Sequence, residues 1–143
     1  MKKLLWIVLM ALPFMTLAVP DQSQFFSEIE VSVNEQSYVL ELAESPGQRA
    51  RGLMYRESLC EDCGMLFVYS RPRVISMWMK NTAIPLDVAF IKENGEIIAI
   101  KQMQPYDLSS VTSEKSATYA WEANQGWFSE QGIKVGDRVE VKK

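Results

Sequence analysis

The chain has 143 residues, with 15 Lys and Arg against 18 Asp and Glu, which gives a formal net charge of −3. An acidic chain has no general attraction for a phosphate backbone, so we expect no nucleic acid partner. The sequence contains no His, which removes the most common neutral-pH general base and the most common metal ligand. We therefore expect no metal or other cofactor, and an enzyme of this composition would need carboxylates, Lys, Tyr or Cys.

The first 18 residues have the pattern of a secretory signal peptide. A positive N-terminus precedes an apolar run that begins at Leu4, and small residues follow at Thr16 and Ala18. Pro13 interrupts this run, which is shorter than the roughly 20 residues of a membrane-spanning helix. We therefore expect cleavage after Ala18 rather than retention as an anchor. The predicted mature protein is periplasmic or secreted, has no stable membrane span and is a monomer.

The rest of the chain suits one domain of ordinary size. Residues 19–27 are a polar lead-in, and residues 28–143 are predicted to form a single β-rich domain. Polar and apolar residues alternate over 28–33 and 38–43, which predicts a β-hairpin around the turn at 34–36. Further strands are predicted at residues 64–69, 73–79, 86–92, 96–102, 117–123 and 138–142.

Two short helices are predicted between these strands. Ser45 and Pro46 suit the N-cap and the first helical position, and the helix is expected to continue to Met54. A second short helix is expected within residues 126–132 and ends at a glycine. Residues 105–115 are polar and rich in Ser, which predicts a surface loop. These elements indicate a mainly β fold, a compact antiparallel β-barrel or sandwich with one or two short helices.

Several motifs occur together along the chain. In order they are Arg51-Gly-Leu-Met-Tyr-Arg56, Gly64-Met-Leu-Phe67, Trp78-Met-Lys-Asn-Thr82, Pro85-Leu-Asp87, Phe90, Glu122 with Gly126, and Gly132 with Gly136-Asp137. The combination resembles the bacterial and archaeal family known as domain of unknown function 192, from Ile29 to Val141. The resemblance implies a compact, β-rich single domain, often exported, with no established activity. The pair Cys60 and Cys63 departs from the family pattern, so a redox role would belong to this branch.

Polar residues next to apolar runs define a candidate binding site near Trp78 and Asp87. A small-molecule site usually combines an apolar floor with a few convergent polar groups. We therefore predict that this region binds a small polar ligand or a segment of a protein partner. The residues assigned to the site are Arg51, Arg56, Trp78, Lys80, Asn81, Thr82, Asp87, Glu122 and Asn124. In the alternative interpretation, the same groups form a structural network in which an arginine pairs with a buried carboxylate.

Two other functions remain open at this point. A hydrolase would use Asp87 and Glu122, because two carboxyls can divide the acid and base roles when their surroundings separate their pKa values. A scaffold protein would instead accept a partner strand at an open sheet edge. The sequence identifies no catalytic residue beyond this pair of carboxyls.

The five arginines at positions 49, 51, 56, 71 and 73 raise the question of a basic patch. We expect separate, solvated side chains, because scattered surface charges are the common case. A local patch is the alternative, and it would be the exception to the acidic character of the chain.

The pair Cys60 and Cys63 is expected to form a disulfide in an oxidising compartment. Glu61 and Asp62 lie between the two cysteines and disfavour the thiolate that a redox catalyst needs. We therefore expect a structural disulfide.

Met77 and Met79 suggest a Cu(I) site, because residues two apart on a strand share a face and thioethers are soft ligands. Two thioethers alone are weak ligands. Methionine that fills the core beside aromatic rings is the ordinary explanation, and we favour it here.

Overall fold

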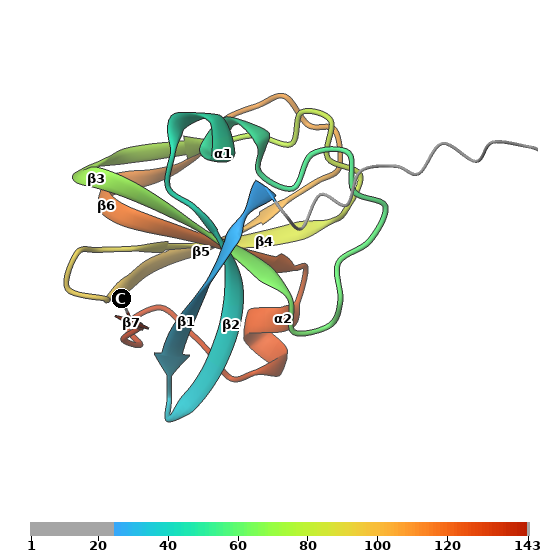
Figure 1. The fold of residues 1–143 in the computed structure, drawn as a ribbon. Helices are drawn as coiled ribbons and strands as arrows, with labels where there is room; N and C mark the ends of the chain where they lie inside the picture. Colours follow the sequence, from blue (N-terminus) through green and yellow to red (C-terminus); the bar gives the residue numbers. More distant parts are fainter. Residues whose placement is uncertain (1–24, 143) are drawn as a thin grey trace, which may run out of the picture.

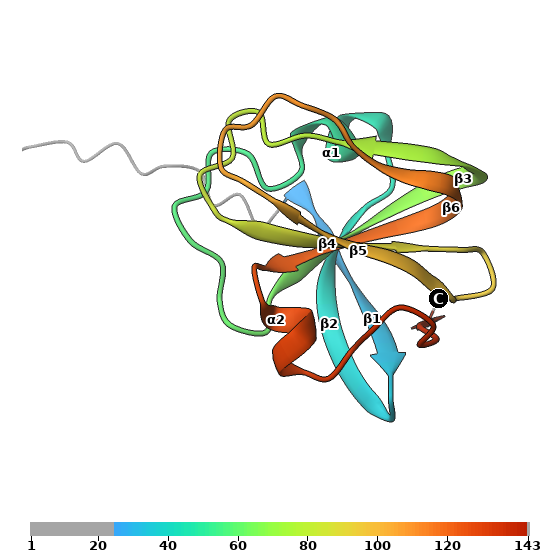
Figure 2. The same cartoon turned by 180° about the vertical axis from the view of Figure 1, so that it is seen from behind.

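A single sheet of seven strands organises the structure, a computed structural model that describes residues 25–142. Its elements are β1 (Ser27–Val33), β2 (Gln36–Ala43), α1 (Pro46–Arg51), β3 (Gly64–Met77), β4 (Leu86–Ile91), β5 (Ile97–Met103), β6 (Val111–Asn124), α2 (Trp127–Glu130) and β7 (Glu140–Lys142). The order across the sheet is β5-β4-β6-β3-β2-β1-β7. Figure 1 shows α1 near the top and α2 toward the bottom, and Figure 2 shows the same arrangement from behind. The predicted signal peptide lies outside the described residues.

The edge strands β5 and β7 approach each other without forming a ladder. Glu96 and Arg138 form an isolated antiparallel bridge, and the amide of Ile97 donates to the carbonyl of Asp137 at 2.9 Å. Over residues 25–142 the sheet is therefore curled but not closed. The predicted mainly β class with a barrel or sandwich architecture and two short helices is confirmed.

The strand pairing is antiparallel with one exception. The predicted hairpin is present, since β1 and β2 pair antiparallel from Ser27 opposite Leu42 to Val33 opposite Gln36. β2 and β3 pair in parallel, which the sequence analysis does not predict. Parallel neighbours need a long crossover connection, and the segment that contains α1 supplies it.

α1 has the predicted start but ends earlier than predicted. The Ser45 hydroxyl accepts from the Gln48 amide at 3.2 Å, and the Gln48 side chain accepts from the Ser45 amide at 3.0 Å. This reciprocal capping box satisfies two amides that the first helical turn leaves unpaired. The helix stops at Arg51 rather than Met54, because Gly52 takes the left-handed φ of 48° that glycine tolerates.

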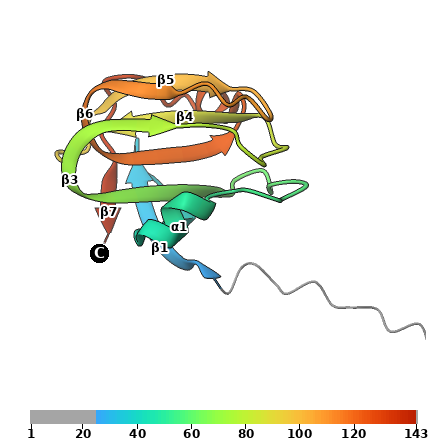
Figure 3. The same ribbon diagram turned by 90° about the horizontal axis from the view of Figure 1, so that it is seen from above.

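β3 is one long strand where the sequence predicts two, at 64–69 and 73–79. Its register with β6 shifts between the two predicted segments. Figure 3 shows the strand curving back there, so that its second half lies across from its first half. As a result, Met77 at the end of β3 packs in the same buried cluster as Phe67 near the start.

β6 begins at Val111, inside the segment 105–115 that the sequence predicts as a loop. Ser113 is buried there, and its hydroxyl accepts from the Ile75 amide at 2.9 Å and donates to the Lys115 carbonyl at 2.6 Å. Because these hydrogen bonds satisfy the buried hydroxyl, the sheet tolerates Ser113 there, and composition alone does not reveal them.

The sheet carries a buried cluster on each face. Leu53, in the connection after α1, belongs to one cluster together with Phe67 and Val88. Trp127 of α2 belongs to the other, and its ring lies 5.3 Å from that of Trp121. The first cluster forms the floor of the candidate site.

Candidate functional site

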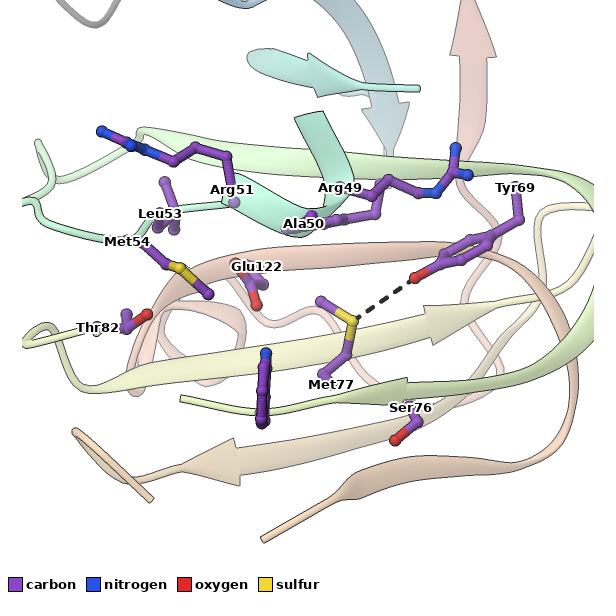
Figure 4. Close-up of a pocket in the computed structure, with 13 residues that line it drawn as sticks. Arg49, Ala50, Arg51, Leu53, Met54, Tyr69, Ser76, Met77, Thr82 and Glu122 are labelled. Atoms are coloured by element: carbon purple, nitrogen blue, oxygen red, sulfur yellow. Dashed lines mark hydrogen bonds between the residues drawn. The ribbon is translucent and has the colours of Figure 1, made fainter. Parts of the chain in front are cut away.

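A hollow of about 290 Å³ lies between α1 and the end of β3, and we call it the α1–β3 pocket. Apolar side chains supply much of its wall, including Leu53, Met54, Phe67 and Met77. Figure 4 shows Met54, Glu122 and Met77 directed into this hollow from three different parts of the chain. The bend in β3 therefore creates the pocket, because it brings the end of the strand opposite α1.

Glu122 contributes a carboxyl to this pocket of mixed polar and apolar lining. It lies on β6, opposite Val88 of β4 and Met65 of β3, and only 4% of its surface is exposed. Burial raises the pKa of Glu122 to about 8, and burial is the sole cause. Within residues 25–142, no ion pair includes this carboxyl. At neutral pH the group is therefore mostly protonated and can donate a hydrogen bond.

Arg49 and Arg51 stand at the mouth of the pocket without pairing with Glu122. The Arg49 guanidinium donates to the carbonyl of Val68 at 3.0 Å and lies 4.9 Å from the ring centre of Tyr69. Figure 4 shows both guanidinium groups turned away from Glu122. Their charges therefore face the rim, and the buried carboxyl keeps its raised pKa.

Tyr69 connects the rim to the pocket interior. Its hydroxyl donates to the sulfur of Met77 at 3.9 Å (Figure 4). Burial raises the pKa of Tyr69, with a smaller contribution of the same sign from Glu122, while Arg49 and Arg73 lower it. The phenol is therefore neutral at physiological pH.

Four of the predicted site residues line the pocket, namely Arg51, Trp78, Thr82 and Glu122. Trp78 is 48% exposed, and the Lys80 ammonium lies 5.2 Å from the centre of its ring. The hydroxyl of Thr82 is buried and donates to the Lys80 carbonyl at 3.0 Å. An exposed indole beside a buried floor is a suitable platform for a flat apolar group.

The structure assigns three predicted residues to structural contacts. Arg56 forms a two-pronged ion pair with Glu41 at 2.5 and 2.6 Å. The amide of Asn81 donates to the Tyr55 hydroxyl at 2.8 Å. The Asn124 amide donates to the carbonyls of Leu59 and Cys60, at 3.2 and 2.9 Å. These contacts hold the loops around the site and do not line the pocket.

Asp87 lies on the other face of the sheet. It pairs with Ala123, whereas Glu122 pairs with Val88, and directly opposed residues on antiparallel strands share a face. The Asp87 carboxyl accepts from the Gly126 amide at 2.8 Å. Burial raises its pKa, and this hydrogen bond lowers it in part. The hydrolase hypothesis is therefore not supported, because the two carboxyls cannot meet one substrate.

Cys60 and Cys63 form the predicted disulfide. The loop that they close is anchored by the Trp127 indole, which donates to the Asp62 carboxyl at 3.0 Å. The purely structural role of this disulfide stays a prediction. The disulfide does not line the α1–β3 pocket.

The two methionines of the Cu(I) hypothesis occupy different positions. Met77 lines the α1–β3 pocket, whereas Met79 is 1% exposed in the core and lies beyond the end of β3. Residues 25–142 contain no group of three or more Cys, Asp or Glu side chains that could hold a metal ion. The same part of the chain has no helix that is long and apolar enough to cross a membrane.

The sequence analysis does not assign Arg49, Tyr69 or Phe67 to the site. Phe67 is part of a buried apolar run, which gives no sign that one of its members borders a hollow. The segment from Tyr69 to Arg73 carries a weak signal, because an aromatic residue and two arginines surround a proline within five positions. Such a proline indicates an interrupted strand, and the bend of β3 occurs there.

The chain is similar to a family of uncharacterised proteins and to solved structures. The model of the family DUF192, described as "Uncharacterized ACR, COG1430", matches residues 29–141, which confirms the predicted resemblance. A protein from Sinorhizobium meliloti 1021, whose description proposes a role in transcription regulation, is 35% identical with a TM-score of 0.78, and the match covers 81% of this chain and 95% of that one. A protein of unknown function from Novosphingobium aromaticivorans DSM 12444 is 32% identical with a TM-score of 0.72, over 80% of this chain and 84% of that one. No curated protein matches the chain.

Proposed function

We propose that this chain, which belongs to the DUF192 family, binds a small amphipathic organic molecule in the α1–β3 pocket. The observation that carries the proposal is the Glu122 carboxyl, which faces an open, partly apolar hollow and has no ion-pair partner among the described residues. A buried polar group without a partner costs free energy, and a ligand that accepts its hydrogen bond recovers that cost.

The lining of the pocket defines the parts of such a ligand. An apolar part would contact Phe67 and Met77, and a flat part would lie against Trp78. A carbonyl or other acceptor would receive the hydrogen bond from Glu122. The pocket volume is at the lower end of the about 300–1,000 Å³ that small-molecule sites span, which favours a small molecule over a protein segment.

Isothermal titration calorimetry with two neutral probes, hexanamide and acetophenone, tests the proposal. The wild-type protein should bind at least one of them. Ala50 is exposed on α1 and lines the pocket, so Ala50→Trp should fill the hollow and weaken binding by about tenfold or more. Ser129→Trp adds the same bulk at an exposed site on α2 and should bind like the wild type. Absence of binding, or equal binding by Ala50→Trp, would overturn the proposal.

Export to the periplasm or the medium is part of the proposal. The N-terminal pattern over residues 1–18 supports it, and so does a disulfide, which persists in oxidising compartments. N-terminal sequencing of the protein recovered from periplasm and medium should start at Val19, and recovery of the intact Met1 form from the cytoplasm would overturn it. We do not extend the transcription role described for the Sinorhizobium meliloti relative, because an exported, acidic chain would not meet the chromosome.

A further inference from the structure

A second hollow adjoins the α1–β3 pocket at the bend of β3. This hollow has a volume of about 440 Å³, and we call it the arginine hollow. It is lined by Arg49, Tyr69, Arg71 and Arg73, together with small residues of the bend. Arg49 and Tyr69 line both hollows, so the two hollows are direct neighbours.

The arginine hollow concentrates positive charge that the protein does not neutralise. The guanidinium of Arg49 lies 4.9 Å from the ring centre of Tyr69, and that of Arg73 lies 5.8 Å from the same centre. In residues 25–142, the ion pairs involve Arg56, Lys92, Lys101 and Lys142, and none includes an arginine of this hollow. The expected separate arginines are thus three neighbours around one hollow.

The positive charge of the arginine hollow contrasts with the negative net charge of the chain. The formal net charge is −3, so a local cluster of unpaired arginines opposes the overall sign. Glu122 is the acid on the wall of the adjoining pocket, and it is mostly protonated at neutral pH. Contacts with the face of Tyr69 stabilise a guanidinium modestly but leave its charge in place. Arg49 already donates to the carbonyls of Glu44 and Val68. The hydrogen-bonding edges of Arg71 and Arg73, in contrast, suit a planar or tetrahedral oxyanion.

We propose that the arginine hollow binds the anionic head, a carboxylate or a phosphate, of the same ligand whose apolar part occupies the α1–β3 pocket. The inference rests on the proposed function and adds the charge of the ligand to it. Arg49 and Tyr69 lie where the two hollows adjoin, next to the junction of the apolar part and the head. Arg71 and Arg73 contact the head.

Calorimetry with probes that share one hexyl chain tests the inference. Hexanoate should bind the wild-type protein about tenfold more tightly than hexanamide at neutral pH and low salt, because a charge-assisted hydrogen bond is stronger than a neutral one. Hexyl phosphate replaces the carboxylate by a phosphate, and the tighter of the two anions identifies the head group. Raising the salt concentration should weaken the binding of both anions and leave the binding of hexanamide unchanged.

The exposed residues Arg71 and Arg73 can be replaced to test the role of the arginine hollow. Arg71→Gln with Arg73→Gln should remove the preference for hexanoate and leave hexanamide binding unchanged. Lys134→Gln with Arg138→Gln removes the same charge at exposed sites near β7 and should keep the preference. Equal binding of hexanoate and hexanamide by the wild type would overturn this inference but not the proposed function. Absence of binding by every probe would overturn the proposed function and the inference with it.

Discussion

Asp87 and Glu122 lie on the adjacent strands β4 and β6 and face opposite sides of the sheet. Asp87 accepts a hydrogen bond from Gly126 at the start of α2, whereas Glu122 faces the α1–β3 pocket. Burial raises the pKa of both carboxyls, but their surroundings give them different roles. Asp87 holds the backbone that leads into α2, and Glu122 supplies a polar group to the wall of the α1–β3 pocket.

The first prediction concerns the pH dependence of stability. Burial raises the pKa of Glu122 from 4.5 to about 8, so between these values the folded state keeps a proton that the unfolded state has lost. The contribution is most favourable below pH 4.5, decreases as the pH rises and levels off above about 8. Urea unfolding at pH 5 and pH 8.5 should show that the wild type loses roughly 2–5 kcal/mol more than Glu122→Gln over this range. Parallel pH profiles of the two proteins would contradict the raised pKa.

The second prediction concerns the protonated state of Glu122 as a hydrogen-bond donor. Acetophenone can accept a hydrogen bond but cannot donate one, so its binding needs the protonated carboxyl. Its affinity should decrease by about tenfold when the pH is raised from 6 to 9.5, across the pKa of about 8. Glu122→Gln retains a donor at both pH values and should bind acetophenone with little pH dependence. Calorimetry measures the acetophenone affinity of both proteins at the two pH values. Equal pH dependence in the two proteins would contradict the assignment of Glu122 as the hydrogen-bond donor.

The third prediction separates the role of Asp87 from the role proposed for Glu122. Asp87→Ala removes the acceptor of the Gly126 amide, so the free energy of unfolding should decrease by about 1–2 kcal/mol. Asp87→Asn keeps an oxygen for this bond and should cost less. Both variants should bind hexanamide like the wild type, because Asp87 faces away from the pocket. Weaker hexanamide binding with unchanged stability would place Asp87 in the site instead.

Features encoded over a few residues are predicted well from the sequence. The alternation before and after Asn34 predicts the β1–β2 hairpin, because each strand carries its own period of two. The predicted N-cap Ser45 begins α1, and its hydroxyl accepts from Gln48, three positions later. The disulfide joins cysteines that are also three apart. In each case the interacting groups are close in the sequence, so local patterns suffice.

Features that depend on distant pairing are not predicted. The faces of Asp87 and Glu122 follow from the β4–β6 register, and a shift of one residue would reverse them. The pocket depends on the bend of β3, which brings Met77 into the same cluster as Phe67. Neither the register nor the bend is visible in a segment read by itself. The sequence analysis therefore names Glu122, which lines the pocket, but pairs it with Asp87, which faces the other side of the sheet.

The last prediction concerns the disulfide. Replacing both Cys60 and Cys63 by Ser should lower the free energy of unfolding by about 2 kcal/mol or less, because the loop that they close is short. The Asn124 amide and the Trp127–Asp62 hydrogen bond hold the same loop, so its position should persist. Hexanamide binding should be unchanged, since the disulfide does not line the α1–β3 pocket.

A structural disulfide and a redox-active one differ in a measurable way. Equilibration of the wild-type protein with defined ratios of reduced and oxidised glutathione should give a reduction potential below about −300 mV, the range of structural disulfides in secreted proteins. A reduction potential of about −120 mV would place the bond among dedicated thiol oxidants and contradict the structural assignment. In that case the loop of Cys60 and Cys63 would be a redox centre, separate from the pocket that Glu122 lines.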